Sequence, residues 1–207
     1  WGSSALAVRE TLGMEHRDVA IIGSGVMGLT SARLLQDAGW NVTIYTRDVA
    51  RHATSNVAGG EWAPGGAHNA SVSSDAFKSQ LLFAARIAHH AYTNLGGADY
   101  GIHWLERYSP SNELRDPSTS MFADLYPFED MLGPGEHPFP TTYCGVRVTM
   151  IVEPATLLRR LIEDFHQAGG KFVIRNFGNK EELLTLPEPV VFNCTGLGAR
   201  ALFGDED

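Results

Sequence analysis

Residues 18–45 read DVAIIGSGVMGLTSARLLQDAGWNVTIY, and this stretch decides the fold. Asp18 to Ile22 is a short apolar run with β-branched side chains that ends at a glycine, which predicts a buried strand. A helix is expected from the following glycines to about Asp37, because apolar residues recur there at three-residue steps. Asn41 to Tyr45 predicts a second strand. Strand, helix and strand in one sheet almost always form a right-handed parallel crossover, so we expect an α/β fold with a parallel sheet.

Between the first strand and the helix, Gly23, Gly25 and Gly28 have the G-x-G-x-x-G spacing of nucleotide-binding loops. The first glycine allows a tight turn, the second lets the backbone approach a pyrophosphate, and the third lets helix and strand pack closely. The helix N-terminus adds N–H groups and a partial positive charge. The loop therefore predicts a dinucleotide site. Arg47 and Asp48 follow the second strand, where they fit a ribose, an NADP 2′-phosphate or an ordinary solvated turn.

The rest of the chain contains further periodic segments. They predict a helix over 75–95, strands over 100–108 and 143–152, a helix from Pro154 to the glycines at 169–170, and short strands over 171–175 and 190–193. The segments 47–74 and 109–140 are rich in small residues and proline and are expected to be loops. After the last strand and a tight turn at 194–196, we expect no closing element. Residues 1–17 are expected to be an N-terminal extension, either the remnant of a removed targeting segment or an addition ahead of Met14.

Composition limits the possible function classes. The 207 residues include 16 Lys and Arg against 24 Asp and Glu, a net charge of −8 that argues against a nucleic-acid partner. No run approaches the length of about 18 apolar residues that a membrane span needs, so no membrane partner is expected. The compartment, cytoplasmic or exported, stays open. Two cysteines, Cys144 and Cys194, exclude a disulfide scaffold, and no Cys–His cluster has the spacing of a metal site.

Three separated segments together resemble the FAD-dependent D-amino acid oxidase family, within the amine oxidases that include glycine and sarcosine oxidases. They are VAIIGSGVMGLTSARLL (19–35), TRD with TSNVAGGEWAP (46–48 and 54–64), and VVFNCTGLGARAL (190–202). The resemblance implies a Rossmann-like FAD-binding domain with a parallel sheet, formed by 18–75 and 150–203, and part of an antiparallel substrate domain at 76–149. It also implies that the remainder of the fold lies outside this chain, so we expect a second chain to supply it.

The resemblance assigns cofactor-binding roles to particular residues. Besides Gly23 and Gly28, the assigned residues are Ser24, Gly25, Val26 and Met27 at the pyrophosphate, Arg47 and Asp48 at the adenosine end, Thr54 and Ser55 at a phosphate, Gly60, Glu61 and Ala63 along the isoalloxazine edge, Phe177 at the adenine, and Cys194, Thr195 and Gly196 at a third backbone approach. The family often has a bulky apolar residue where Glu61 stands and an aromatic residue where Gly65 stands. The particular substrate therefore stays open.

The chemistry of the family gives the expected function. Family members pass a hydride from the substrate α-carbon to the flavin, the imine hydrolyses to a keto acid and ammonia, and O2 reoxidises the flavin to give hydrogen peroxide. We therefore expect an FAD-dependent oxidase of a D-amino acid or a related small amine. A nicotinamide-dependent reductase and a non-catalytic FAD-binding fragment are the alternatives. The arginine that binds the substrate carboxylate comes from the later half of family members, so no catalytic residue is assigned in this chain.

Overall fold

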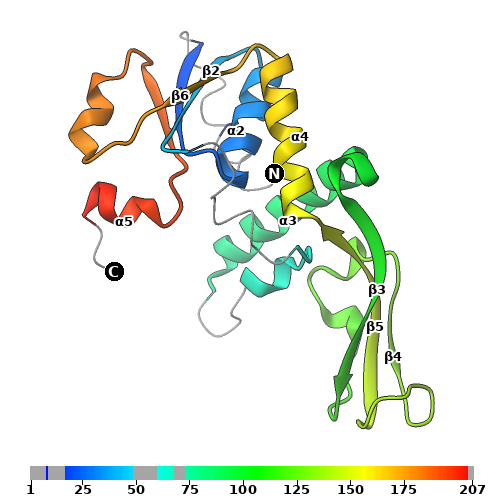
Figure 1. The fold of residues 1–207 in the computed structure, drawn as a ribbon. Coiled ribbons are helices and arrows are strands. Elements are labelled where there is room, and N and C mark those ends of the chain that lie inside the picture. Colours follow the sequence, from blue (N-terminus) through cyan, green and yellow to red (C-terminus); the bar gives the residue numbers. More distant parts are fainter. Residues whose placement is uncertain (1–7, 9–16, 49–59, 68–72, 205–207) are drawn as a thin grey trace. The chain divides into compact units, whose positions relative to one another are not determined.

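The computed structural model describes residues 8, 17–48, 60–67 and 73–204 of the chain, which divide into two compact units (Figure 1). Unit 1 comprises Trp1–Gly59 and Pro154–Asp207, and unit 2 comprises Gly60–Glu153. Unit 1 is thus built from two stretches of chain, and the whole of unit 2 is inserted between them.

Unit 1 contains a parallel sheet of four strands in the order β6-β2-β1-β7. The strands are β1 (Asp18–Ile22), β2 (Asn41–Thr46), β6 (Lys171–Ile174) and β7 (Val190–Asn193). In the central strand β1, Ile21 pairs with Ile44 of β2 on one side and with Phe192 of β7 on the other. A strand in this position is covered on both faces, which explains why β1 is a continuous apolar run. The predicted parallel α/β fold is confirmed.

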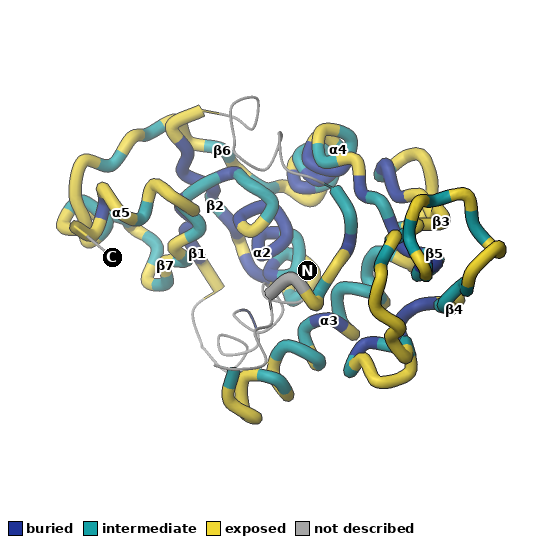
Figure 2. Tube along the Cα trace, turned by 90° about the horizontal axis from the view of Figure 1, so that it is seen from below, coloured by how far each residue is buried: buried dark blue, intermediate teal, exposed yellow. Residues whose placement is uncertain are grey.

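Two helices of unit 1 pack against each other, and Figure 2 shows buried residues gathered along α2. α2 (Val26–Asp37) connects β1 to β2, and α4 (Pro154–Gln167) leads into β6. The Gln36 side-chain amide donates a hydrogen bond to the Phe165 carbonyl oxygen at 3.0 Å, which joins the two helices. The core between the sheet and these two helices contains large, fully buried side chains: Ile21, Leu29, Leu35, Ile44, Leu161 and Phe165. A second cluster of Ala20, Ile22 and Tyr45 packs against Phe177, Leu183 and Leu186.

Unit 2 combines one long helix with an antiparallel sheet. The helix α3 (Asp75–Leu95) begins at Ser74, whose hydroxyl oxygen accepts a hydrogen bond from the Phe77 N–H at 3.2 Å. The sheet has the order β3-β5-β4, with β3 (Ile102–Ser111), β4 (Glu129–Leu132) and β5 (Tyr143–Val152). Short 3-10 turns lie at η2 (Pro64–Ala67), η3 (Ala98–Tyr100), η4 (Pro117–Thr119) and η5 (Ala123–Leu125). The antiparallel sheet expected from the family resemblance is confirmed.

Three elements differ from the sequence-based prediction. β4 lies inside the segment 109–140 that was expected to be loop; its sequence EDML has no alternating pattern, and it is a strand because it pairs with β5. The strand predicted at 100–108 begins at Ile102 and continues to Ser111, since Ala98–Tyr100 form a 3-10 turn. The expectation of no closing element after the turn at 194–196 was wrong. The six-residue helix α5 (Gly198–Phe203) follows that turn, and it is too short to reveal a helical period.

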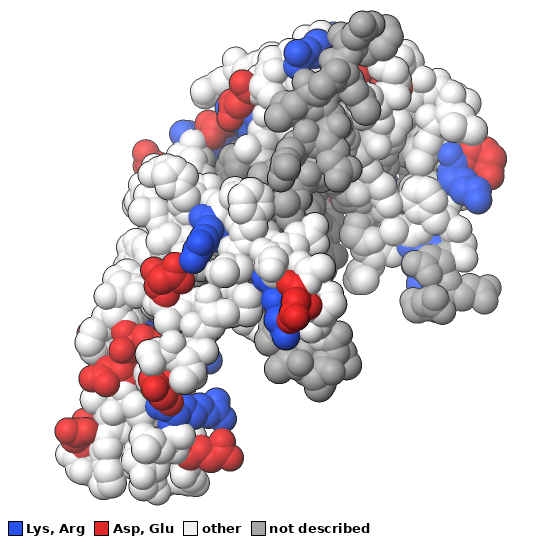
Figure 3. All heavy atoms as spheres, turned by 180° about the vertical axis from the view of Figure 1, so that it is seen from behind, with Lys and Arg blue, Asp and Glu red and all other residues white. Residues whose placement is uncertain are grey.

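Charged side chains of both signs lie beside one another on the face shown in Figure 3. Ion pairs that are open to solvent include Arg86 with Asp124 at 2.9 Å and Arg159 with Glu163 at 3.0 Å. Exposed pairs of this kind each stabilise a fold by about 0–1 kcal/mol. Within the described ranges, no helix combines the length and the apolar character needed to cross a membrane.

Candidate functional site

A pocket of about 1110 Å³ opens in unit 1 at the carboxyl ends of the four parallel strands. Its wall is formed by the turn after β1, the end of β2, the segment after β6, and the turn and helix after β7. Open parallel sheets bind ligands at this edge, at the point where the strand order reverses and the chain continues on opposite sides of the first strand. In unit 1 this point lies between β1 and β7, because the chain first adds β2 and β6 on one side of β1 and later adds β7 on the other.

The turn at Gly23 is where the backbones of β1 and β7 approach each other. Gly23 has a φ of 110°, and a Cβ added there would overlap the Cys194 carbonyl oxygen. Its N–H donates to the Tyr45 carbonyl oxygen at 2.8 Å, and the Cys194 N–H donates to the Ile22 carbonyl oxygen at 2.9 Å. A Cβ on Gly28 would overlap the Gly23 carbonyl oxygen, so α2 begins directly against the turn. Only glycine fits these two positions, as a phosphate-binding turn requires.

The N-terminus of α2 faces the same pocket. Gly25 is its N-cap residue and has no side chain that could accept a hydrogen bond from the helix, and Val26 and Met27 line the pocket. The first turn of α2 contains no acidic side chain. The partial positive charge of this twelve-residue helix is therefore available to an anion.

Hydroxyl groups join the glycine turn to the end of β2. The Ser24 and Thr46 hydroxyl oxygens are buried and lie 3.0 Å apart. Ser24 also donates to the Asp48 carbonyl oxygen at 3.1 Å, and Thr46 donates to the same oxygen at 2.7 Å. These bonds fix the backbone around Arg47 and Asp48, both of which line the pocket. A cation and a carboxylate at this point suit the hydroxyl groups of a ribose.

Aromatic and cationic side chains form the wall on the β2 and β6 side. The Arg175 guanidinium lies over the Phe177 ring, 4.6 Å from its centroid, and the Tyr45 ring meets the Phe177 ring edge-on at 5.9 Å. The Tyr45 hydroxyl donates to the Glu188 carboxylate at 3.2 Å. Burial and the neighbouring Glu188 charge raise the pKa of Tyr45, so its hydroxyl keeps its proton. Flat π-surfaces of this kind suit a purine ring.

The turn after β7 completes the pocket. The Asn193 side-chain oxygen accepts hydrogen bonds from the Thr195 N–H at 3.2 Å and from the Thr195 hydroxyl at 2.7 Å. Gly196 follows with a φ of 56°. Burial raises the pKa of the Cys194 thiol to about 11, against a smaller opposite effect of its hydrogen bond with Ser31. The thiol is therefore protonated at neutral pH and is not a nucleophile.

The pocket brings together many of the predicted site residues. Those that line it are Gly23, Ser24, Gly25, Val26, Met27, Arg47, Asp48, Phe177, Cys194, Thr195 and Gly196. Gly28 is not in the lining but packs beneath the turn, Thr54 and Ser55 lie outside the described residues, and Gly60, Glu61 and Ala63 belong to unit 2. The pocket is also lined by residues that were not predicted from the sequence, among them Tyr45, Thr46, Arg175 and Asn193. All four lie at or next to the carboxyl end of a predicted parallel strand, which is the signal that could have found them.

Comparison with known proteins gives the class of the chain. Residues 18–207 match the model of a family described as FAD dependent oxidoreductase. The chain belongs to this family. The D-amino acid oxidase of Dugesia ryukyuensis is 29% identical over 201 residues, which cover 91% of this chain and 57% of that protein. The D-amino-acid oxidase of Streptomyces coelicolor is 30% identical over 189 residues, which cover 91% of this chain and 55% of that protein. The chain thus spans a little over half the length of these curated relatives.

A solved structure supports the fold independently of the sequence. The glycine oxidase from Geobacillus kaustophilus superposes with a TM-score of 0.62 at 16% identity, covering 91% of this chain and 58% of that one. The Rossmann-like fold and the family resemblance expected from the three motifs are therefore confirmed. FAD is the cofactor of the family. The unit 1 pocket fits its nucleotide half, because Gly23 and Gly28 allow the tight turn between β1 and α2, and the first turn of α2 carries no acidic side chain.

Proposed function

We propose that this chain is the cofactor-binding portion of an FAD-dependent oxidase that deaminates a D-amino acid or a related small amine. The observation that carries the proposal is the convergence of the turns after β1, β2 and β7 on one pocket at the carboxyl ends of a parallel sheet. The net reaction consumes the amino acid, O2 and water and releases a keto acid, ammonia and hydrogen peroxide. FAD, when bound, supplies the two-electron acceptor for oxidation of the substrate C–N bond.

Each part of the pocket has a separate role in this proposal. Main-chain N–H groups of 24–27 and the positive end of α2 bind the pyrophosphate. Arg47 and Asp48 bind the ribose, and Phe177, with Arg175 stacked on it, holds the adenine. The Thr195 turn approaches the cofactor from the β7 side. Thr54 and Ser55, and Gly60, Glu61 and Ala63 of unit 2, keep the phosphate and flavin-edge roles that the family resemblance gives them.

A further polypeptide segment is part of the proposal. The chain spans 57% of the Dugesia relative, and the resemblance assigns the arginine that binds the substrate carboxylate to the later half of such proteins. We expect activity only when that half is present, in the same or a second chain. Gel filtration and mass spectrometry test this directly. A lone species of 22.5 kDa that binds FAD and turns over an amino acid would contradict it.

Equilibrium binding tests the cofactor assignment. The chain is incubated with FAD, FMN or NAD, separated from free ligand, and examined by visible absorbance. We expect bound flavin bands with FAD and no retention of NAD. Asn193→Ala removes the side-chain oxygen that accepts both hydrogen bonds from Thr195, so the turn after β7 is no longer held in place. FAD affinity should therefore fall about tenfold, which corresponds to the free energy of about one uncharged hydrogen bond. Asn41→Ala is the matched control, because Asn41 lies on the same sheet at the amino end of β2, where its side-chain amide donates to the Asp18 carboxylate and does not line the pocket.

A peroxide assay tests the reaction. The FAD-loaded protein, together with the later half of the fold, is supplied with a panel of D- and L-amino acids, glycine and N-methyl amino acids. Peroxide and a keto acid in equal amounts support the oxidase. A yellow protein that yields no peroxide with any of them would favour a non-catalytic FAD-binding fragment, and retention of NAD without flavin would favour a nicotinamide-dependent reductase.

A further inference from the structure

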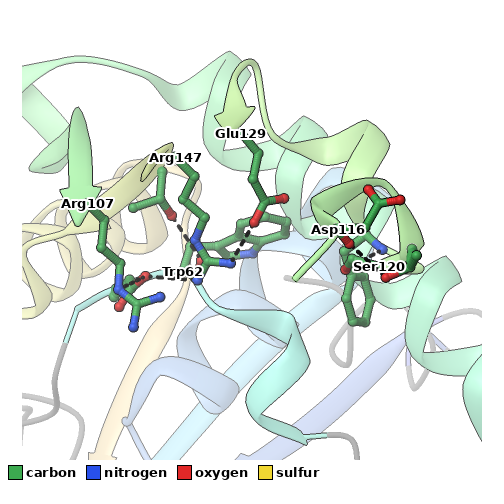
Figure 4. A network of polar contacts seen from close by, with 10 residues as sticks. Trp62, Arg107, Asp116, Ser120, Glu129 and Arg147 are labelled. Carbon is green, nitrogen blue, oxygen red and sulfur yellow. Dashed lines mark hydrogen bonds and ion pairs between the residues drawn. The ribbon is translucent and has the colours of Figure 1, made fainter. Parts of the chain in front are cut away.

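Unit 2 contains a row of charged side chains that runs across its three strands (Figure 4). Arg107 of β3 is paired in register with Arg147 of β5, and Arg147 is paired in turn with Glu129 of β4. Like charges placed directly opposite each other destabilise a sheet, so the two arginines need a counter-charge. Glu61 supplies it: one of its carboxylate oxygens lies 3.4 Å from a nitrogen of each arginine. Glu129 lies 3.8 Å from Arg147 on the other side.

Glu61 comes from a short extended segment that continues the sheet where β4 ends. β4 pairs with β5 only between Cys144 and Arg147. Beyond that range the same edge of β5 is taken by Gly60–Trp62: the Trp62 N–H donates to the Met150 carbonyl oxygen at 2.9 Å, and the Gly60 carbonyl oxygen accepts from the Val152 N–H at 2.8 Å. The backbone of residues 60–62 is thus bonded to β5, and the Glu61 side chain reaches back along the strand to the arginines.

Arg147 holds this segment in two ways. Its side chain is only 20% exposed, and its guanidinium lies over the Tyr126 ring, 4.6 Å from the centroid. The Tyr126 ring meets the buried Trp62 ring edge-on at 5.9 Å. Arg147 therefore contacts Glu61 directly and supports its neighbour Trp62 through one intervening ring. Among the described residues, the Arg107 side chain forms an ion pair with Glu61 but stacks on neither the Tyr126 nor the Trp62 ring, and it is 42% exposed. We therefore expect Arg107 to stabilise the segment 60–62 less than Arg147 does.

We propose that Arg147, assisted by Arg107, is a positioning residue that acts through Glu61 to fix residues 60–63 and to neutralise the carboxylate there. The inference rests on the proposed function, which assigns the flavin edge to Gly60, Glu61 and Ala63. Family members often have an apolar residue at the position of Glu61, and the two arginines are the compensation for an acid in that place. Glu61 is accordingly held by two guanidinium groups.

Hydrogen exchange of the unliganded chain tests the positioning role without FAD. In Arg147→Gln we expect the Trp62 amide to exchange about fivefold faster, as loss of a partly buried ion-pair network implies. Arg147→Lys keeps the charge without the planar fork and should give an intermediate rate. Arg115→Gln is the control, because Arg115 pairs with Glu113 in an exposed turn and does not contact residues 60–63. Equal exchange in all three variants would overturn the proposal.

The reduction potential of bound FAD tests the charge compensation. Arg147→Gln leaves the Glu61, Arg107 and Glu129 group with one net negative charge, so the potential should fall. The double variant Glu61→Gln/Arg147→Gln is neutral again, and its potential should return toward that of the parent. A fall that persists in the double variant would refute the role of Glu61. If Arg147→Gln does not fold, Arg107→Gln is measured in its place. Failure to bind FAD would count against the proposed function, while hydrogen exchange would still decide the positioning role.

Discussion

Replacing Gly23 by alanine perturbs the point at which the whole candidate site depends on backbone geometry. Two costs arise there. The φ of 110° lies in a region that alanine rarely adopts, and the new methyl group would overlap the Cys194 carbonyl oxygen across the β1–β7 boundary. The first cost is about 1–2 kcal/mol. The second is about 1–3 kcal/mol, the range found when atoms are forced into a packed site.

Gly39→Ala separates these two costs. Gly39 follows α2 with a φ of 81°, and no heavy atom lies within 4 Å of a Cβ built there. Both variants reduce the entropy of the unfolded chain in the same way, so that contribution cancels between them. The expected difference in the free energy of unfolding between the two variants is therefore the overlap alone, about 1–3 kcal/mol.

Urea unfolding followed by circular dichroism measures both variants, and FAD titration adds a second readout. Gly23→Ala should unfold at lower urea with an unchanged slope and should bind FAD more weakly, because the β7 turn must move away from the glycine turn. Gly39→Ala should keep the FAD affinity of the parent. Equal destabilisation by the two substitutions would show that the turns after β1 and β7 do not meet at Gly23 and Cys194 and so do not form one pocket.

Other predictions concern single side chains. Alkylation of Cys194, followed by peptide mass spectrometry, should rise with pH to a midpoint at about 11; a midpoint below 9 would contradict its burial. Burial lowers the pKa of His89, so the neutral form stabilises the fold above about pH 6.5 and stability is lost as the pH falls below that value. His89→Gln should flatten this loss in thermal melts, and an unchanged loss in that variant would contradict the role of His89. Ser74→Ala removes the cap of α3 and should cost about 1 kcal/mol in urea unfolding, and an equal cost for Ser79→Ala, within the same helix, would argue against capping.

Local patterns were sufficient for the four parallel strands of unit 1 and for its two longer helices, α2 and α4. The apolar run of β1, the glycine spacing and the period of α2 each reflect packing within a few residues, so they could be recognised without the tertiary structure. β4 and α5 could not, because the four residues of Glu129–Leu132 are a strand only through pairing with β5, and six residues of Gly198–Phe203 are too few to establish a helical period.

The candidate site divides in the same way. The glycine turn carries a spacing that follows from backbone physics, and the residues after β1 were therefore predictable. The stacking of Arg175 on Phe177 depends on how the segment after β6 folds back, which no periodicity encodes. The compensation of Glu61 by Arg107 and Arg147 joins residues from three distant parts of the chain. Sequence alone marked Glu61 as a departure from the family but offered no partner for it.

The insertion of unit 2 into unit 1 has a consequence for biosynthesis. β1 and β2 leave the ribosome first, yet the strands that flank them, β6 and β7, are translated only after all of unit 2. Near its two ends unit 2 is tied together by the hydrogen bond from the Val152 N–H to the Gly60 carbonyl oxygen, so the points at which the chain enters and leaves unit 2 lie close together. Early folding of unit 2 would thus shorten the effective loop that the late strands must close, which lowers the entropic barrier to completing the parallel sheet.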